Sequence, residues 1–223
     1  TIDATVLLEF ISRHNTFAAP FTGVPLRLDY LVAWYARELL MRDEFRGING
    51  YWNAKKEEAV MLPEINIGLA VDTEHGLVVP VVHDVEHVTS FAVFAYEARA
   101  VIDKARRGAL GLHEMRDLTF TVNNTGVLGG ENPSPLIPYT VDADGTERPT
   151  AMILALARIR RERKRSVLPL VFRFDHRLFD GREAVAFVRA LRERIEAKKS
   201  PEEFTAELSV VPMMSKNNNA RLV

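Results

Sequence analysis

The stretch Phe-Asp-His-Arg-Leu-Phe-Asp-Gly, residues 174–181, holds the most information about the fold. It follows an apolar run at 168–174, which predicts a strand, and it precedes a helical pattern at 181–198. His176 therefore comes just past a strand, and Asp180 comes immediately before a helix. Rigid elements on both sides of such a loop hold a side chain in a fixed position. Imidazole, with an ordinary pKa of about 6.5, is suited to proton transfer near neutral pH.

A structural role accounts for the same residues. Asp180 is a plausible helix N-cap, Gly181 suits a turn, and a lone histidine at the end of a strand is often structural. The octapeptide by itself therefore leaves both interpretations open.

A second segment, Thr-Phe-Thr-Val-Asn-Asn-Thr-Gly at 119–126, reads as a strand that runs into a glycine-containing turn. Around the two segments, short β-rich runs predict further strands at 59–62, 65–71, 77–82 and 152–157. Apolar residues at helical spacing predict helices at 28–42, at 90–107 and near the N-terminus. Several strands adjacent in sequence, with long helices between others, favour an α/β sandwich with a mixed sheet.

No linker or repeat divides the chain, so we expect one domain over 1–223.

The composition excludes several functional classes. The 223 residues include 29 Lys+Arg and 30 Asp+Glu, a balance that provides no bulk positive field for nucleic acid or anionic lipid. The absence of cysteine excludes disulfides and a thiolate nucleophile, and it fits a reducing compartment. No apolar run is long enough for a membrane span. Because the chain begins with Thr1, we expect it to be a fragment or a processed chain.

Taken together, the motifs resemble the catalytic domain of the dihydrolipoamide acyltransferases (E2) of 2-oxo acid dehydrogenase complexes. That family has an Asp-His-Arg-x-x-Asp-Gly motif and, about fifty residues earlier, a Phe-Thr-Ile-Ser-Asn-x-Gly-like strand. Further matches occur in order at 1–5, at 66–73 with 76–82, and at 105–108. The resemblance spans nearly the whole chain.

The resemblance implies a two-layer sandwich like that of chloramphenicol acetyltransferase, in homotrimers with active sites between subunits. It also implies a possible 24- or 60-subunit cage and E1 and E3 components as partners. His176 would be the general base that takes the proton from the thiol of coenzyme A or of dihydrolipoamide. The lipoyl group would arrive on a separate domain. Full proton transfer from a thiol to imidazole costs only about 2.7 kcal/mol at ordinary pKa values, so base catalysis during the attack is feasible.

Two further site residues come from the resemblance. Asn123 occupies the position of the family's serine, whose hydroxyl donates to the oxyanion. The Asn123 amide can also donate, but it is longer and planar, and a plain turn role is equally compatible with the sequence. Asp180 would tether the loop through an ion pair with an arginine. Arg177 would have a surface or ion-pair role.

The chain departs from the family in two more places. A segment at 142–147 reads as an insertion near the acyl pocket, and the tail at about 204–223 is atypical, which bears on cage assembly. A basic run at 158–165 is typical of a solvated hairpin tip, with contact to coenzyme A phosphates or to an acidic partner chain as alternatives. The histidines outside the motif show no metal-ligand spacing, and no residues are assigned to cofactor or metal binding.

Three hypotheses follow. The first is acyl transfer between dihydrolipoamide and coenzyme A at the core of a 2-oxo acid dehydrogenase complex. The second is an acyl-CoA-dependent transferase that acts on a small acceptor, and the third is a non-catalytic E2-like scaffold. No metal, nucleic acid or membrane partner is expected. The expected compartment is the cytoplasm, or the mitochondrial matrix in a eukaryote.

Overall fold

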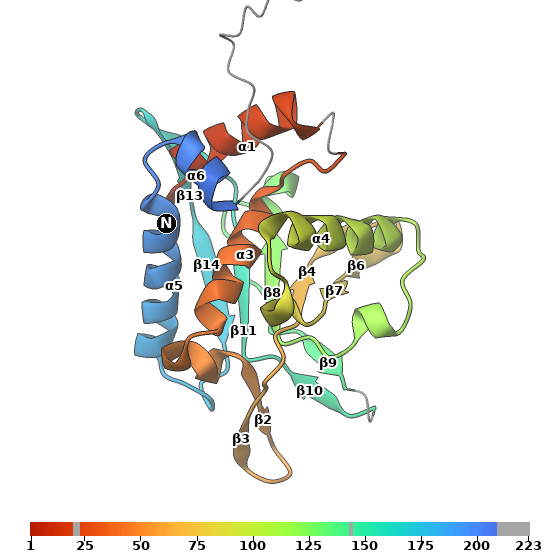
Figure 1. Ribbon diagram of the computed structural model, residues 1–223. Coiled ribbons are helices and arrows are strands. Elements are labelled where there is room, and N and C mark those ends of the chain that lie inside the picture. Colours follow the sequence, from red (N-terminus) through yellow and green to blue (C-terminus); the bar gives the residue numbers. More distant parts are fainter. Residues whose placement is uncertain (20–22, 143–144, 209–223) are drawn as a thin grey trace, which may run out of the picture.

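A five-stranded sheet forms the centre of the computed structural model, which describes residues 1–19, 23–142 and 145–208 (Figure 1). Its strand order is β14-β11-β8-β4-β7. The parallel strands are β4 (Ile67–Leu69), β8 (Phe120–Asn124) and β11 (Met152–Leu156), and the antiparallel edge strands are β7 (Val81–Val82) and β14 (Leu170–Phe174). The predicted mixed sheet is confirmed.

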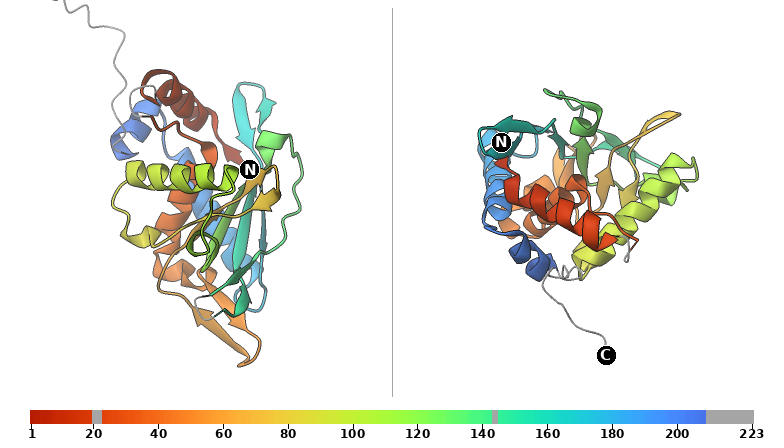
Figure 2. Two further views of the ribbon diagram at one scale, coloured as in Figure 1. Left: turned by 90° about the vertical axis from the view of Figure 1, so that its right-hand side faces the viewer. Right: turned by 90° about the horizontal axis from the view of Figure 1, so that it is seen from above.

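Helices cover one face of this sheet, so that helices and sheet form two layers (Figure 2). The layer contains α3 (Leu28–Leu40), α4 (Phe91–Arg106) and α5 (Gly181–Glu196). At one end of it, α1 (Thr5–Phe17) packs against α6 (Pro201–Leu208). The predicted helices at 28–42, 90–107 and 181–198 are thus present, with ends within two residues of those expected.

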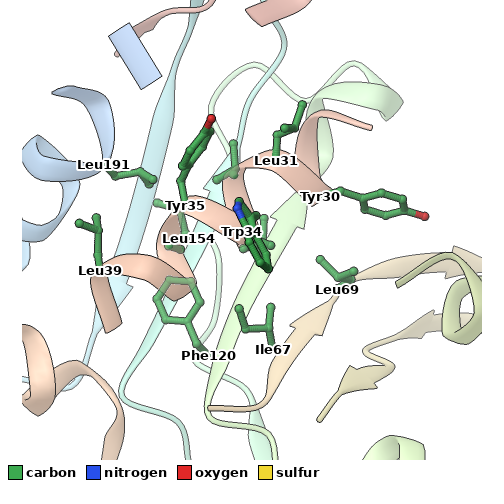
Figure 3. Close-up of a cluster of buried hydrophobic side chains, with 14 of the residues drawn as sticks. Tyr30, Leu31, Trp34, Tyr35, Leu39, Ile67, Leu69, Phe120, Leu154 and Leu191 are labelled. Carbon is green, nitrogen blue, oxygen red and sulfur yellow. The ribbon is translucent and has the colours of Figure 1, made fainter. Parts of the chain in front are cut away.

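The core lies between α3 and the sheet (Figure 3). Helix α3 is buried on almost every side because α4 and α5 flank it, and its buried side chains include Trp34, Tyr35 and Leu39. Phe120 of β8 contacts Phe187 of α5, with ring centroids 5.8 Å apart. Burial of such large aromatic side chains supplies most of the hydrophobic stabilisation of a fold of this kind.

Four hairpins extend from the central layers. They pair β2 (Gly50–Asn53) with β3 (Glu58–Met61), β5 (Val71–Thr73) with β6 (Gly76–Val78), β9 (Tyr139–Val141) with β10 (Glu147–Pro149), and β12 (Arg160–Glu162) with β13 (Arg165–Leu168). The short strand β1 (Ile2–Asp3) joins β13. Short 3-10 helices are η1 (Asp43–Ile48), η2 (Val85–His87), η3 (His113–Met115) and η4 (Thr125–Leu128).

The structure differs from the sequence predictions at the hairpins. The runs at 65–71 and 77–82 each divide in two: β4 and β7 belong to the central sheet, whereas β5 and β6 pair with each other. Pro80 lies at one break, and proline has no N–H to donate to a continuous ladder. Of the segment at 142–147 that reads as an insertion, Glu147 begins β10, and residues 143–144 lie outside the described residues. The basic run includes β12 and the start of β13, whose residues 160–165 are exposed.

The chain's ends agree with the predictions only in part. Residues 204–208 of the expected atypical tail belong to α6, where Phe204 and Leu208 are buried, and 209–223 lie outside the described residues. Within the described ranges, no helix is both long and apolar enough to cross a membrane.

Candidate active site

The loop that carries His176 joins the edge strand β14 to helix α5. The amide of Asp175 donates to the carbonyl of Ala151 over 2.9 Å, and the amide of Leu178 donates to the carbonyl of Asp175 over 3.0 Å. Phe179 is buried and stacks on Phe174, with ring centroids 5.1 Å apart. The loop is therefore held at its start, at its turn and at its end.

Asp175 and Arg177 fix the loop on either side of His176. The Arg177 Nε donates to Asp175 Oδ1 over 2.8 Å, and Arg177 Nη2 lies 2.5 Å from Asp175 Oδ2. The backbone amide of Arg177 also donates to Oδ1. The hydrogen bonds from the Arg177 side chain hold the pKa of the buried Asp175 carboxyl below its usual value. Arg177 therefore takes part in an ion pair that shapes the loop.

The ring of His176 is exposed between these anchors. It lies 4.3 Å from the ring of Phe174, centroid to centroid, with the planes tilted by 49°. No hydrogen bond to either ring nitrogen is recorded within residues 1–19, 23–142 and 145–208. The imidazole thus remains accessible to a substrate or to another subunit.

Asp180 caps α5 rather than contacting the imidazole. Its carboxylate accepts from the amides of Arg182 and Glu183 over 2.8 and 3.1 Å, and the Glu183 side chain accepts from the Asp180 amide. These backbone donors lower the pKa of Asp180, that from Glu183 most strongly. Within the described residues, the arginine that pairs with Asp180 is Arg182, two positions along the chain, whose Nη2 lies 3.7 Å from Oδ2 in an exposed pair. The capping box therefore holds the loop more firmly than the ion pair does.

Asn123 lies near the carboxyl end of β8, on the sheet face opposite the helices. Side chains alternate along a strand, and the buried Phe120 and Val122 point into the core, so Asn123 points away from it. The turn that follows β8 is tight. A Cβ on Gly126 would meet the Ala157 carbonyl oxygen at 2.5 Å, so this position requires glycine.

The register of the sheet separates His176 from Asn123. Asn123 is level with Ala155 and hence with Val171 near the start of β14, whereas Phe174 at the far end of β14 is level with Phe120. Three residues along the strand and two strand spacings across the sheet give a backbone separation of about 14 Å between Asn123 and Phe174. His176 lies beyond Phe174. We therefore expect the side chains of His176 and Asn123 in one chain to lie too far apart to act on the same carbonyl group.

Each end of the sheet has its own cavity. A cavity of ≈ 400 Å³ beside the end of β8 is lined by Asn124, Gly126 and Val127, together with the ion-paired Arg27 and Asp29. Another, of ≈ 390 Å³, adjoins Arg177 and is lined by residues of the β2–β3 and β9–β10 hairpins. The sequence pattern does not group either set of lining residues, because each set comes from segments that are far apart in the chain.

Histidines outside the motif also come together. His83 and His113 stack with centroids 4.2 Å apart, and a His83 ring nitrogen lies 2.9 Å from the His113 carbonyl oxygen. Among the residues that the structure describes, no group of three or more metal-ligating His, Asp or Glu side chains is found.

Comparison with known proteins shows which family the chain resembles. Residues 1–205 match the family model of the 2-oxoacid dehydrogenases acyltransferase catalytic domain. The human mitochondrial dihydrolipoyllysine-residue succinyltransferase component of the 2-oxoglutarate dehydrogenase complex is 29% identical over 195 residues, which cover 84% of this chain and 39% of that protein. The chain thus spans well under half the length of this relative.

Solved structures share the fold. Azotobacter vinelandii dihydrolipoamide acetyltransferase superposes with a TM-score of 0.75 at 28% identity, covering 87% of this chain and 78% of the other. That structure comes from an investigation of one serine, one histidine and one asparagine in the enzyme's catalytic mechanism. The cubic core of a pyruvate dehydrogenase multienzyme complex superposes equally well, at 27% identity, with coverage of 87% and 78%. Chloramphenicol acetyltransferase, with a TM-score of 0.50, 17% identity and coverage of 75% and 76%, shares the fold, which confirms the expected fold class.

Proposed function

Because the chain belongs to the catalytic domains of the 2-oxoacid dehydrogenase acyltransferases, we propose that it transfers an acyl group between a dihydrolipoyl thiol and coenzyme A. The observation that carries the proposal is the exposed imidazole of His176, held on a loop that Asp175, Arg177 and Asp180 fix from both sides. The relatives act on different acyl groups by name, succinyl and acetyl, so their names leave the acyl group of this chain open.

In the proposed reaction, His176 accepts the proton of the incoming thiol as its sulfur attacks the thioester carbonyl carbon. A new C–S bond forms, and the carbonyl oxygen becomes an oxyanion in the tetrahedral intermediate. When the intermediate collapses, the C–S bond to the first carrier breaks, and His176 returns the proton to the departing sulfur. General acid–base catalysis of this kind typically contributes a factor of about 10² to 10⁴ in rate.

The oxyanion needs a hydrogen-bond donor, and we propose the side-chain amide of Asn123 from a neighbouring subunit. The separation of His176 and Asn123 within one chain supports this arrangement, because in an oligomer the His176 end of one sheet can lie against the Asn123 end of the sheet in a second copy.

In the Azotobacter enzyme the named histidine and asparagine lie four positions apart, as His176 and Asp180 do here. We therefore propose for Asp180 a positioning role, in which its cap fixes the start of α5 and with it the end of the histidine loop.

We propose a homotrimer as the catalytic unit. In a closed ring of three copies, the same contact between unlike surfaces occurs three times, so each His176 faces the Asn123 of a neighbouring subunit. Exposed apolar side chains just after β8 support such a contact: Val127 and Leu128 are 67% and 70% exposed. The likeness to a cubic core supports a larger cage built from trimers. Lipoyl domains and the E1 and E3 components of a complex are the corresponding partners, in a reducing compartment such as the cytoplasm or the mitochondrial matrix.

The experiment measures acyl transfer from acyl-CoA to dihydrolipoamide for the parent protein and for His176→Ala. We expect the variant to lose a factor of about 10² or more in kcat. Its mass in solution should equal that of the parent. Equal rates in both proteins would contradict the base assignment. A parent that transfers acyl groups only to other small acceptors would support the second hypothesis, and an inactive parent would support a scaffold.

A further inference from the structure

The cavity of ≈ 390 Å³ beside the histidine loop has a polar and aromatic lining. It lies between the β2–β3 hairpin, which contributes Tyr51 and Trp52, and the β9–β10 hairpin, which contributes Tyr139 and Arg148. Arg177, the neighbour of His176, completes it. The cavity stays close to the histidine loop because Ala151, three residues beyond Arg148, accepts the amide of Asp175.

Arg148 is an unusual residue in this lining. It is only 4% exposed, and its Nη1 is buried without a hydrogen-bond partner. Its guanidinium carbon lies 4.8 Å from the centre of the Tyr51 ring, so the aromatic ring covers one face of the group. Within the described residues no carboxylate lies within ion-pair distance of Arg148. A buried guanidinium N–H without an acceptor is costly to the fold, and a bound anion at this position would remove that cost.

The other charges around the cavity limit what it accepts. Arg177 is already paired with Asp175 and offers little net charge. Lys55 is exposed, and Asp142 and Glu147 are also lining residues. The negative charge of Glu147 disfavours a polyanion such as the phosphate groups of coenzyme A more than it disfavours a single carboxylate. A single planar carboxylate, in contrast, matches the in-plane fork of one guanidinium.

We propose that this cavity, referred to below as the Arg148 cavity, binds the free carboxylate of an acyl group that carries a second carboxyl function. The proposal rests on the proposed function. In it, Arg148 binds the terminal carboxylate of the acyl group, and the thioester at the other end of the same group reacts at His176. The hairpin that supplies Arg148 adjoins the segment where the sequence departs from the family pattern. Arg148 is here a binding residue, and it takes no part in the proton transfer.

The first test compares two acyl donors of similar length, succinyl-CoA and butyryl-CoA, which differ by the terminal carboxylate. For Arg148→Gln we expect kcat/KM with succinyl-CoA to fall about 10- to 100-fold, as for loss of a charge-assisted hydrogen bond. With butyryl-CoA the change should stay within about twofold, which also shows that the variant is folded. Arg148→Lys should recover part of the succinyl rate. The control is Arg107→Gln, an exposed arginine at the end of α4, which should change neither rate.

The second test requires no catalysis, so it separates this proposal from the proposed function. Monomethyl succinate keeps one carboxylate and presents the other end as an ester, and its binding is followed by the fluorescence of Trp52 in the cavity. We expect saturable binding to the parent, at least tenfold weaker binding to Arg148→Gln, and no response to methyl butyrate. Equal binding by the parent and Arg148→Gln, or no binding to the parent, would overturn the proposal. An Arg148-dependent response to inorganic phosphate alone would overturn the carboxylate assignment.

Discussion

Individual side chains in the histidine loop have separate tasks. Asp175 and Arg177 neutralise each other and hold the turn, Asp180 satisfies the first amides of α5, and His176 is exposed. This division explains why one loop carries so many ionisable residues. Only the imidazole is left to exchange a proton with a substrate.

The Asn123 assignment predicts the effect of restoring the family's serine. A serine hydroxyl is shorter and rotates freely, so Asn123→Ser should raise kcat, by up to about tenfold if the amide is a poorly placed oxyanion donor. Asn124→Ser, one position along and on the other face of the strand, is the matched control and should not raise it. The measurement is steady-state acyl transfer to dihydrolipoamide. An unchanged kcat for Asn123→Ser would show that this position does not limit the reaction.

The Asp175–Arg177 pair predicts a pH dependence of stability. The pKa of Asp175 is lower in the folded chain than in the unfolded one, so the unfolded chain binds the proton more readily. The stabilisation is therefore complete above the ordinary aspartate pKa of about 4, and it is lost as the pH falls through the lower folded value. Urea unfolding of the parent and of Asp175→Asn should show a difference at pH 6 that shrinks below pH 4. A difference that stays constant over this range would contradict this origin.

At the scale of elements, the sequence predicted the three long helices and the strands β8, β11 and β14 because their apolar periodicity is strong. It did not predict where the runs at 65–71 and 77–82 divide. Each break lies where the chain stops pairing within the central sheet and starts pairing within the β5–β6 hairpin. The β9–β10 hairpin was missed for the same reason: Thr140 and Arg148 are buried by contacts with distant segments. Local pattern therefore predicts elements better than it predicts their pairing.

Helix α6 belongs to the folded unit, and its docking predicts a stability effect. Phe204 is fully buried and stacks on Phe10 of α1, with ring centroids 5.3 Å apart. Phe204→Ala should lower the free energy of unfolding by about 3–5 kcal/mol, as in other large-to-small core changes. Phe17→Ala, at a side chain 45% exposed, is the control and should cost far less. Chemical denaturation measures both, and equal small effects would mean that α6 does not pack as described.

At the scale of the whole molecule, the sequence predicted His176, Asn123 and Asp180 as site residues but gave no means of seeing that one chain holds them apart. That separation follows from the antiparallel pairing of β14 with β11 and the parallel pairing of β8 with β11. Register of this kind depends on the entire sheet. The cavity around Arg148 was likewise invisible in the sequence, because three separate segments form it.

The proposed trimer contact predicts the effect of a surface charge. Leu128, 70% exposed near the end of β8, should lie in the contact, so Leu128→Asp should dissociate the trimer and abolish acyl transfer. Tyr96 is 66% exposed on α4, in the helical layer on the other side of the sheet, and Tyr96→Asp should leave both properties unchanged. Light scattering after gel filtration measures the mass. A Leu128→Asp protein that stays trimeric and active would exclude this loop from the contact.

The most direct test of the shared active site mixes two inactive subunits. His176→Ala and Asn123→Ala are co-expressed with different tags, and trimers that carry both tags are isolated. Each mixed trimer then contains one site with an intact histidine from one subunit and an intact asparagine from its neighbour, so activity should return to about one third of that of the parent. If His176 and Asn123 instead acted within a single chain, or if Asn123 had no role, the mixed trimers would show no more activity than the average of the two variants alone.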